Sequence, residues 1–102
     1  ALAGADGIVS GNAQAIPEHY VAVWEAVKAG DAKKAMQIQH RTNMLNQIMC
    51  HDYDKARFKA VLQHRGVLEY DCMRAPLQPV SSEEAKAMNA LLDEKEFTRV
   101  VV

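Results

Sequence analysis

The sequence predicts an α/β protein in which one buried strand precedes four helices within 102 residues. The strand prediction rests on residues 4–13, where Ile8 and Val9 stand between glycines, as in short strands buried on both faces of a parallel sheet. The helix predictions rest on apolar residues that recur at helical spacing through most of the remaining chain. Buried backbone N–H and C=O groups need partners, so the strand requires neighbours outside these residues or on another chain.

The first helix is expected to begin at Pro17. The backbone N–H of a first-turn residue has no acceptor within the helix, so proline, which has no N–H, loses no hydrogen bond there. Glu18 and Lys28 suit the two ends of the helix dipole, and Gly30 supplies a left-handed stop. We expect Trp24 to pack against neighbouring structure rather than to stack on a ligand. The apolar stripe of this helix comprises Tyr20, Val23, Trp24 and Val27.

The second helix is expected to span roughly residues 32–51, with Asp31 as its N-cap. Its apolar face comprises Ala35, Ile38, Leu45 and Ile48, and we expect three methionines, Met36, Met44 and Met49, to widen that face. The pair Gly30-Asp31 between the two helical patterns predicts an antiparallel helical hairpin with a shared core.

The third helix is expected over residues 55–64, with Asp54 as its cap and Gly66 as its end. Its inward residues are predicted to be Phe58, Val61 and Leu62. Residues 67–80 contain Pro76 and Pro79, so we expect them to cross the surface in extended form.

A capping box formed by Ser81 and Glu84 predicts the start of the fourth helix. The apolar positions of this helix are Ala85, Met88, Leu91 and Leu92. The chain then ends in Val100, Val101 and Val102, an apolar and β-prone tail.

The charge balance gives no signal for nucleic-acid or membrane partners. Twelve Lys and Arg residues are offset by thirteen Asp and Glu residues, for a net charge of −1, and no basic stripe appears. No apolar run approaches the roughly 18 residues that span a bilayer, and no leader pattern is seen. Cys50 and Cys72 form no C-x-x-C motif and are expected to be free thiols. We therefore expect a cytoplasmic protein.

Several motifs in the chain resemble one enzyme family. They are the run Gly-Ala-Asp-Gly-Ile-Val-Ser-Gly-Asn-Ala at 4–13, Pro17-Glu18, the Trp-Glu-Ala-Val-Lys-Ala-Gly-Asp run at 24–31, the helix pattern 55–62 followed by Gly66, and Arg-x-Pro-Leu-x-Pro at 74–79. Together they are similar to the C-terminal portion of the dihydrodipicolinate synthase / N-acetylneuraminate lyase family. The resemblance covers nearly the whole chain in the right order.

The resemblance implies a (β/α)8 barrel enzyme followed by a helical subdomain. A complete barrel takes about 250 residues, so this chain is expected to be the C-terminal portion of a longer protein. Residues 1–30 would form the last βα unit and residues 31–102 the C-terminal helical subdomain. Proteins of this family are class I aldolases that bind pyruvate or another 2-oxo acid as a Schiff base on a lysine. No cofactor is implied, and we expect a homo-oligomer, a dimer or tetramer, with contacts between this segment and the rest of the barrel.

Four residues at the end of the predicted strand are expected to line the substrate site: Val9, Ser10, Gly11 and Asn12. Active sites of parallel barrels lie at the carboxyl ends of the strands. By resemblance, Val9 would lie beside the bound pyruvate, and residues 10–12 would border the variable tail of the substrate. Gly11 stands where sialic acid lyases carry a substrate-contacting serine, which counts against that activity. Ser10 does not match the nucleophile elbow, because Ile8 and Asn12 stand where glycines are required.

No catalytic residue is expected in this segment. The family's Schiff-base lysine, its tyrosine acid/base and its Gly-Thr-Thr-type turn lie on earlier strands, and all seven lysines here fall in predicted helices. Lys55 and Lys59 are expected on a solvated surface, without the desolvation that activates a lysine amine. Arg74 is expected to anchor the crossing segment. The spacing of His19, His40, His51, His64 and the two cysteines disfavours a metal site.

Two alternatives stay open. Within the family, a 2-keto-3-deoxy sugar-acid aldolase suits the Arg-x-Pro-Leu-x-Pro segment as well as a dihydrodipicolinate synthase does. From a different class, the chain could be a non-catalytic helical module that binds a partner through its Met-rich face.

Overall fold

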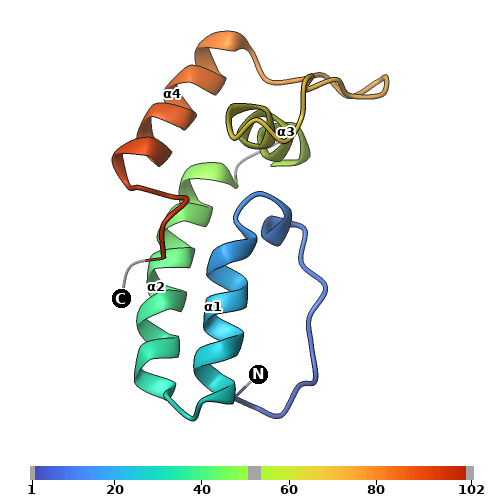
Figure 1. Cartoon of the computed structure of the whole chain (residues 1–102). Coiled ribbons are helices and arrows are strands. Elements are labelled where there is room, and N and C mark those ends of the chain that lie inside the picture. Colours follow the sequence, from blue (N-terminus) through green and yellow to red (C-terminus); the bar gives the residue numbers. More distant parts are fainter. Residues whose placement is uncertain (1, 51–53, 101–102) are drawn as a thin grey trace.

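The computed structural model describes residues 2–50 and 54–100, which form helices joined by loops (Figure 1). A short 3-10 helix, η1 (Asn12–Gln14), precedes four α-helices: α1 (Pro17–Lys28), α2 (Ala32–Met49), α3 (Asp54–His64) and α4 (Ser82–Glu94). Helices α1 and α2 run side by side, and α3 and α4 lie across one end of this pair. The four predicted helices are therefore confirmed.

The turn between α1 and α2 forms as the sequence predicts. Gly30 has a φ of 77°, the left-handed conformation that ends a helix without a Cβ clash. The N–H of Gly30 donates to Val27 O at 3.0 Å and that of Asp31 to Ala26 O at 2.9 Å, which is the Schellman arrangement. The Asp31 carboxylate accepts from the Lys34 N–H at 3.0 Å and so caps α2.

The inward face of α2 differs from the prediction at two methionines. Its buried residues are Ala35, Ile38, Thr42, Leu45 and Met49. Met36 and Met44 instead keep 55% and 37% of their surface exposed, so they do not widen this face. The reason is geometric: Met36 and Met44 are eight residues apart on one side of α2, away from the line through Ile38, Leu45 and Met49.

Helix α3 ends at Gly66, as expected, with a φ of 78° and a second Schellman pair, Gly66 N to Gln63 O at 3.0 Å and Val67 N to Leu62 O at 2.9 Å. Its Phe58 and Val61 are buried. Its N-terminal cap was predicted at Asp54, whose side chain lies outside the described part of the chain, as do His51 and residues 52–53.

The crossing segment 67–80 contains no helix and runs over the surface of α3. Two side chains of α3 hold it: Lys59 Nζ donates to Cys72 O at 2.7 Å, and Gln63 Nε2 donates to Glu69 O at 3.1 Å. The expected anchor, Arg74, is exposed, and its side chain makes no hydrogen bond or ion pair within residues 2–50 and 54–100. Pro76 and Pro79 disfavour a helix in the crossing segment, as predicted. The side chains that hold the segment belong to α3 and not to the segment itself.

Helix α4 begins at half of the predicted capping box. Ser81 Oγ accepts from the Glu84 N–H at 3.2 Å, but the Glu84 carboxylate leaves the cap and pairs with Arg57. The helix ends in a third Schellman pair, Glu96 N to Asp93 O at 3.0 Å and Phe97 N to Leu92 O at 3.1 Å. Here Glu96, with a φ of 51°, occupies the left-handed position that glycine usually takes.

The core lies where the α1–α2 pair meets α3 and α4. Its buried residues are Ala15, Ile16, Leu45, Met49, Phe58, Ala60, Val61, Met88, Leu92 and Phe97. A smaller cluster of Ala26, Ala35 and Ile38 closes the other end of the pair, with Val100 packed against it. Trp24 is half-buried and belongs to neither cluster. Val101 and Val102 lie outside the described residues.

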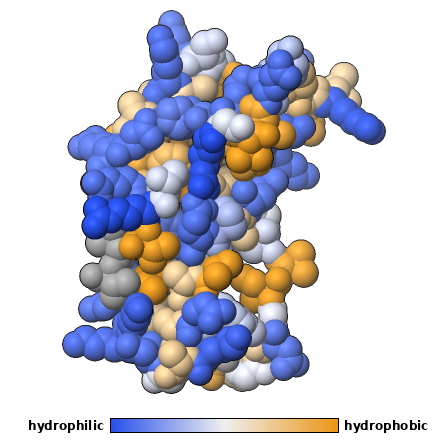
Figure 2. All heavy atoms as spheres, in the orientation of Figure 1, coloured by the Kyte–Doolittle hydropathy of each residue, from blue (hydrophilic) through white to orange (hydrophobic). Residues whose placement is uncertain are grey.

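The predicted strand at residues 4–13 is absent. Residues 2–50 and 54–100 contain no β-strand, and the segment before η1 runs apart from α1 without a partner (Figure 1). Ile8 is 66% exposed and Val9 is fully exposed, and hydrophobic atoms appear on this side of the surface in Figure 2. The physical reason is that a strand forms only through hydrogen bonds to another strand, and no other described segment pairs with residues 4–13.

None of the described helices is long and apolar enough to cross a lipid bilayer.

Candidate functional site

The four predicted site residues lie together at the end of the exposed segment, where the chain turns into η1. Val9 and Gly11 are exposed, and Ser10 and Asn12 are half-buried. Gly11 adopts a helical conformation and opens η1 without a side-chain cap, and the turn closes through Ala15 N to Asn12 O at 3.3 Å. The side chains of Val9, Ser10 and Asn12 form no hydrogen bond to another described residue. These residues are therefore adjacent and at least partly accessible to solvent.

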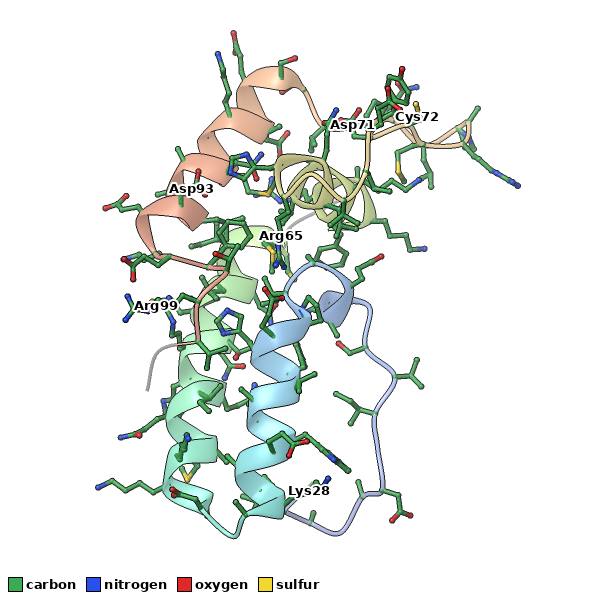
Figure 3. All side chains as sticks on the ribbon, viewed as in Figure 1. Lys28, Arg65, Asp71, Cys72, Asp93 and Arg99 are labelled. Atoms are coloured by element: carbon green, nitrogen blue, oxygen red, sulfur yellow. The ribbon has the colours of Figure 1, made fainter. Side chains whose placement is uncertain are left out.

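Behind this turn lies a side chain that the sequence patterns do not single out, Arg65. Its Nη1 donates to Ala15 O at 2.8 Å and to Glu18 Oε1 at 2.9 Å, and its Nη2 donates to Glu18 Oε2. The guanidinium thus binds the Glu18 carboxylate through both terminal nitrogens. One of these nitrogens, Nη1, also binds the Ala15 carbonyl just before α1. Figure 3 shows Arg65 at the junction of η1, α1, α3 and the end of α4.

The Arg65–Glu18 pair sets the protonation of Glu18. Burial by itself raises the pKa of the Glu18 carboxyl, but the hydrogen bond from Arg65, a backbone hydrogen bond and electrostatic interactions with Arg65 and His19 together lower it below its ordinary value. Side-chain exposure is 20% for Arg65 and 32% for Glu18, so solvent screens the pair only in part.

The aromatic ring of Phe97 packs against the other side of this junction. The Arg65 Cζ lies 5.7 Å from the centre of the Phe97 ring, and the His64 ring stacks on Phe97 at a centroid distance of 6.2 Å. The Phe97 carbonyl accepts a hydrogen bond from His19 Nε2 at 2.6 Å, and His19 is fully buried in α1. The residues after α4 are therefore tied to the start of α1.

Two further arginines cap helix C-termini, where unpaired carbonyls carry partial negative charge. Arg57 is 6% exposed, and its Nε and Nη2 donate to Met49 O at 2.7 Å and Ile48 O at 2.8 Å at the end of α2. Arg41 donates to the carbonyls of Lys95 and Glu96 after α4. A buried Arg57 was not expected, because the charged run around it reads as a solvated surface in the sequence.

None of the seven lysines has the buried setting of a Schiff-base nucleophile. Six are exposed, and the seventh, Lys59, is half-buried with its ammonium on the Cys72 carbonyl. Lys55 lies on the solvated side of α3, as predicted. Lys28 stands at the opposite end of α1 from Arg65 (Figure 3).

A groove of about 500 Å³ lies between α3, α4 and the crossing segment, and none of residues 9–12 lines it. His64 on its wall contacts both oxygens of Asp93, at 3.0 and 2.9 Å. Ser82 borders the same groove from the start of α4, roughly 16 Å along the helix axis from Asp93. The hydroxyl is too far from the His64–Asp93 pair to form a catalytic triad with it.

No group of three His, Cys, Asp or Glu side chains within residues 2–50 and 54–100 is arranged to hold a metal ion. His51, one of the weighed histidines, lies outside these residues. No disulfide joins Cys50 to Cys72 in the described chain, and Cys72 is exposed.

Comparison with known proteins finds one family and several relatives that are named as lyases or synthases. The sequence model of the Dihydrodipicolinate synthetase family matches residues 1–95. The N-acetylneuraminate lyase of Mediterraneibacter gnavus is 34% identical over 83 residues, which cover 79% of this chain and 26% of that enzyme. The 4-hydroxy-tetrahydrodipicolinate synthase 2 of Clostridium acetobutylicum is 28% identical over 91 residues, which cover 89% and 32%. N-acetylneuraminate lyase 2 of Escherichia coli is 26% identical over 92 residues, covering 90% and 30%. The chain thus spans about a quarter to a third of the length of these relatives.

Proposed function

Because the chain belongs to the dihydrodipicolinate synthetase family, we propose that it supplies the C-terminal part of a pyruvate-dependent class I aldolase or lyase. The observation that carries the proposal is the family match over residues 1–95, together with relatives that are named as lyases and a synthase. The substrate of the whole enzyme is pyruvate or another 2-oxo acid. No metal or organic cofactor takes part in the proposed chemistry.

The proposed reaction forms or cleaves a carbon–carbon bond next to the 2-oxo group. A lysine amine adds to the 2-oxo carbon and water leaves, which gives a protonated imine. In cleavage, the 4-hydroxyl loses its proton, the bond between carbons 3 and 4 breaks with its electron pair moving toward the imine nitrogen, and an aldehyde leaves behind the enamine. In synthesis, loss of a proton from carbon 3 gives the enamine, which attacks an aldehyde. The exposed lysines of this chain lack the desolvation that frees an amine at neutral pH. We therefore assign the nucleophile to a lysine outside residues 1–102 and propose that this segment alone is inactive.

Within that enzyme, residues 1–30 form the last βα unit of a (β/α)8 barrel and residues 31–102 form the helical subdomain. The exposure of Ile8 and Val9 supports this placement, because two β-branched apolar residues in an extended segment suit a strand that other barrel strands would cover. In the barrel, Val9, Ser10, Gly11 and Asn12 line the substrate site from the carboxyl end of the strand.

The substrate class is either that of a dihydrodipicolinate synthase or that of a 2-keto-3-deoxy sugar-acid aldolase. Gly11 presents no side chain to a substrate, which argues against a contact by a hydroxyl at this position. We further propose a cytoplasmic homo-oligomer, a dimer or tetramer, as the resemblance to this enzyme family implies.

The test is borohydride trapping with pyruvate. The 102-residue chain and the protein recovered from its source with an antibody against this chain are each treated with pyruvate and sodium borohydride, and peptides are identified by mass spectrometry. We expect an adduct in the recovered protein on a lysine outside residues 1–102, and none on the 102-residue chain. An adduct on one of the seven lysines here would overturn the site assignment, and its absence from both samples would overturn the Schiff-base mechanism.

A second candidate function is a non-catalytic helical module. Exposed Met36 and Met44 favour it, because flexible thioethers on a helix surface suit a partner's apolar groove. If the chain is such a module, the double variant Met36→Lys with Met44→Lys should lose binding to the partner. The aldolase proposal instead expects that the same double change in the whole enzyme leaves the pyruvate adduct trapped by borohydride unaffected.

A further inference from the structure

The segment that carries the candidate site residues is held at one end by contacts from the far part of the chain. In the described chain, residues 4–11 form no hydrogen bond to another element. Leu2 and Ala3 precede them beside α1 and α2, and on the side of the candidate site residues their placement depends on the turn that follows. That turn consists of η1 and Ala15, and both Ala15 and Ile16 are fully buried in the core. A buried carbonyl needs a donor, and Arg65 supplies one to Ala15 at 2.8 Å.

We propose that Arg65 is a positioning residue for the turn at residues 12–15 and thereby for the candidate substrate-lining residues 9–12. The assignment of those residues to the substrate site rests on the proposed function, whereas the control of the turn by Arg65 does not. Arg65 contacts no substrate in this proposal and acts through Ala15 and Glu18.

The guanidinium suits this role because its donors are used in two directions at once. Nη1 reaches both the Ala15 carbonyl and Glu18 Oε1, and Nη2 reaches Glu18 Oε2. The planar fork therefore fixes the end of η1 relative to the first turn of α1. A lysine carries a point charge without this fork and cannot reproduce all three contacts.

Arg65 is itself held by the C-terminal part of the chain. Its backbone N–H donates to Val61 O at 2.9 Å, and the left-handed Gly66 follows it. Phe97, which is 3% exposed, packs below the guanidinium with Cζ 5.7 Å from the ring centre. The residues after α4 thus support Arg65, and Arg65 supports the turn.

The test is amide hydrogen exchange, followed by NMR, on the 102-residue chain and its variants. The Ala15 N–H donates to Asn12 O at 3.3 Å and closes the turn, so its exchange reports whether the turn is held. We expect Arg65→Gln, which removes the charged donor from the Ala15 carbonyl, to loosen the turn and lower the protection of the Ala15 amide by about tenfold or more relative to the amides in the first half of α2. The amide shifts of residues 9–14 change with it. The matched control is Arg57→Gln, because Arg57 is also an interior arginine of the α3 region but bonds to α2 and α4. It should lower protection most at the end of α2, where its carbonyl contacts lie, and should change the Ala15 amide no more than the amides in the first half of α2.

A charge reversal separates the carbonyl contact from the ion pair. The double variant Arg65→Glu with Glu18→Arg restores opposite charges but places no donor on the Ala15 carbonyl from position 65. We expect the double variant to recover part of the free energy of unfolding that Arg65→Gln loses, while the Ala15 amide stays unprotected against exchange. Equal losses at Ala15 in Arg65→Gln and Arg57→Gln would overturn the proposal. Full recovery of Ala15 protection in the double variant would also overturn it, since the ion pair alone would then position the turn. Both outcomes are independent of borohydride trapping, because no substrate is used.

Discussion

Arg57 and Glu84 join the end of α2 to the first turn of α4 through an ion pair whose arginine is almost completely buried. The same guanidinium donates to the last carbonyls of α2, so three elements meet on one side chain. The Glu84 carboxylate, half-exposed, lies at the N-terminal end of α4, where the helix dipole favours a negative charge.

Replacing Arg57 by Gln is expected to lower the free energy of unfolding by about 3 kcal/mol, because the buried carbonyls of Ile48 and Met49 and the carboxylate of Glu84 lose their donor. Urea unfolding followed by circular dichroism measures the change. Arg74→Gln is the matched control, since Arg74 is exposed and makes no side-chain contact in the described chain, and should change stability by less than about 0.5 kcal/mol. Equal effects of the two variants would contradict the contacts of Arg57.

Replacing Glu96 by Gly is expected to raise the free energy of unfolding by about 1 kcal/mol. Glu96 holds a φ of 51° at the end of α4, a conformation that costs a residue with a Cβ about this amount. Its ion pair with Arg99 is exposed at 3.5 Å and contributes little. Gly66→Ala, at a φ of 78°, is the complementary variant and should lower stability by a similar amount. A loss of stability in Glu96→Gly would show that another contact of Glu96 outweighs the backbone strain.

Stability is expected to fall in acid through Glu18. Its pKa is lower in the folded chain than in the unfolded chain, so folding is favoured more when the carboxylate is ionised. This contribution is complete above the unfolded value, about 4.3, and is lost as the pH falls through the folded value. Unfolding free energies measured from pH 7 to pH 2 should therefore fall less steeply in Glu18→Gln than in the unmodified chain. Parallel curves would show that the Arg65–Glu18 pair does not hold in solution.

The buried ring of His19 is expected to carry its hydrogen on Nε2. The Phe97 carbonyl can only accept, so the 2.6 Å contact requires Nε2–H as donor, while Nδ1 is buried without a partner among the described residues. Long-range ¹H–¹⁵N NMR correlations distinguish the two neutral tautomers. The exposed His40 serves as the internal reference for an unconstrained ring. Observation of the Nδ1–H tautomer at His19 would rule out this hydrogen bond.

Replacing Ile8 and Val9 by Ser together is expected to leave the free energy of unfolding of the 102-residue chain within about 0.5 kcal/mol of its original value, because both side chains are exposed. Loss of two exposed apolar groups should also reduce self-association in sedimentation experiments. Ile38→Ser is the contrasting variant and should lower stability by more than about 3 kcal/mol, since Ile38 is 1% exposed. A large loss in the double variant would mean that residues 4–13 pair as a strand within or between chains.

Local patterns were enough to locate all four helices. Asp31 and Ser81 cap their helices as predicted, and Gly30 and Gly66 take the left-handed conformation that ends a helix. These signals act within a few residues, so the sequence reports them directly. The strand predicted at residues 4–13 does not form within the described chain, whose residues offer it no partner, and the sequence already required that its partners lie elsewhere.

The arginine contacts could not be read from the sequence. Arg65 and Glu18 are 47 residues apart, and Arg57 and Glu84 are 27 apart, so no periodicity brings these charges together. From the sequence, a charged residue in a helix is expected to be exposed to solvent. It can be buried only where neighbouring elements supply carbonyls or a carboxylate to pair with it, and the sequence does not show these partners. Helix packing, and not a local sequence pattern, therefore brings Arg65 next to the candidate site residues.

The sequence by itself determined the positions of the four helices, the family and the choice of the run Val9 to Asn12 as candidate site residues, because these depend on residue type and short-range spacing. The tertiary structure alone decided which charges are buried and which far parts of the chain hold the turn after that run. The physical reason is that hydrogen bonds from Arg65 to Ala15 and Glu18 exist only once α1, α3 and the residues after α4 have packed into one core.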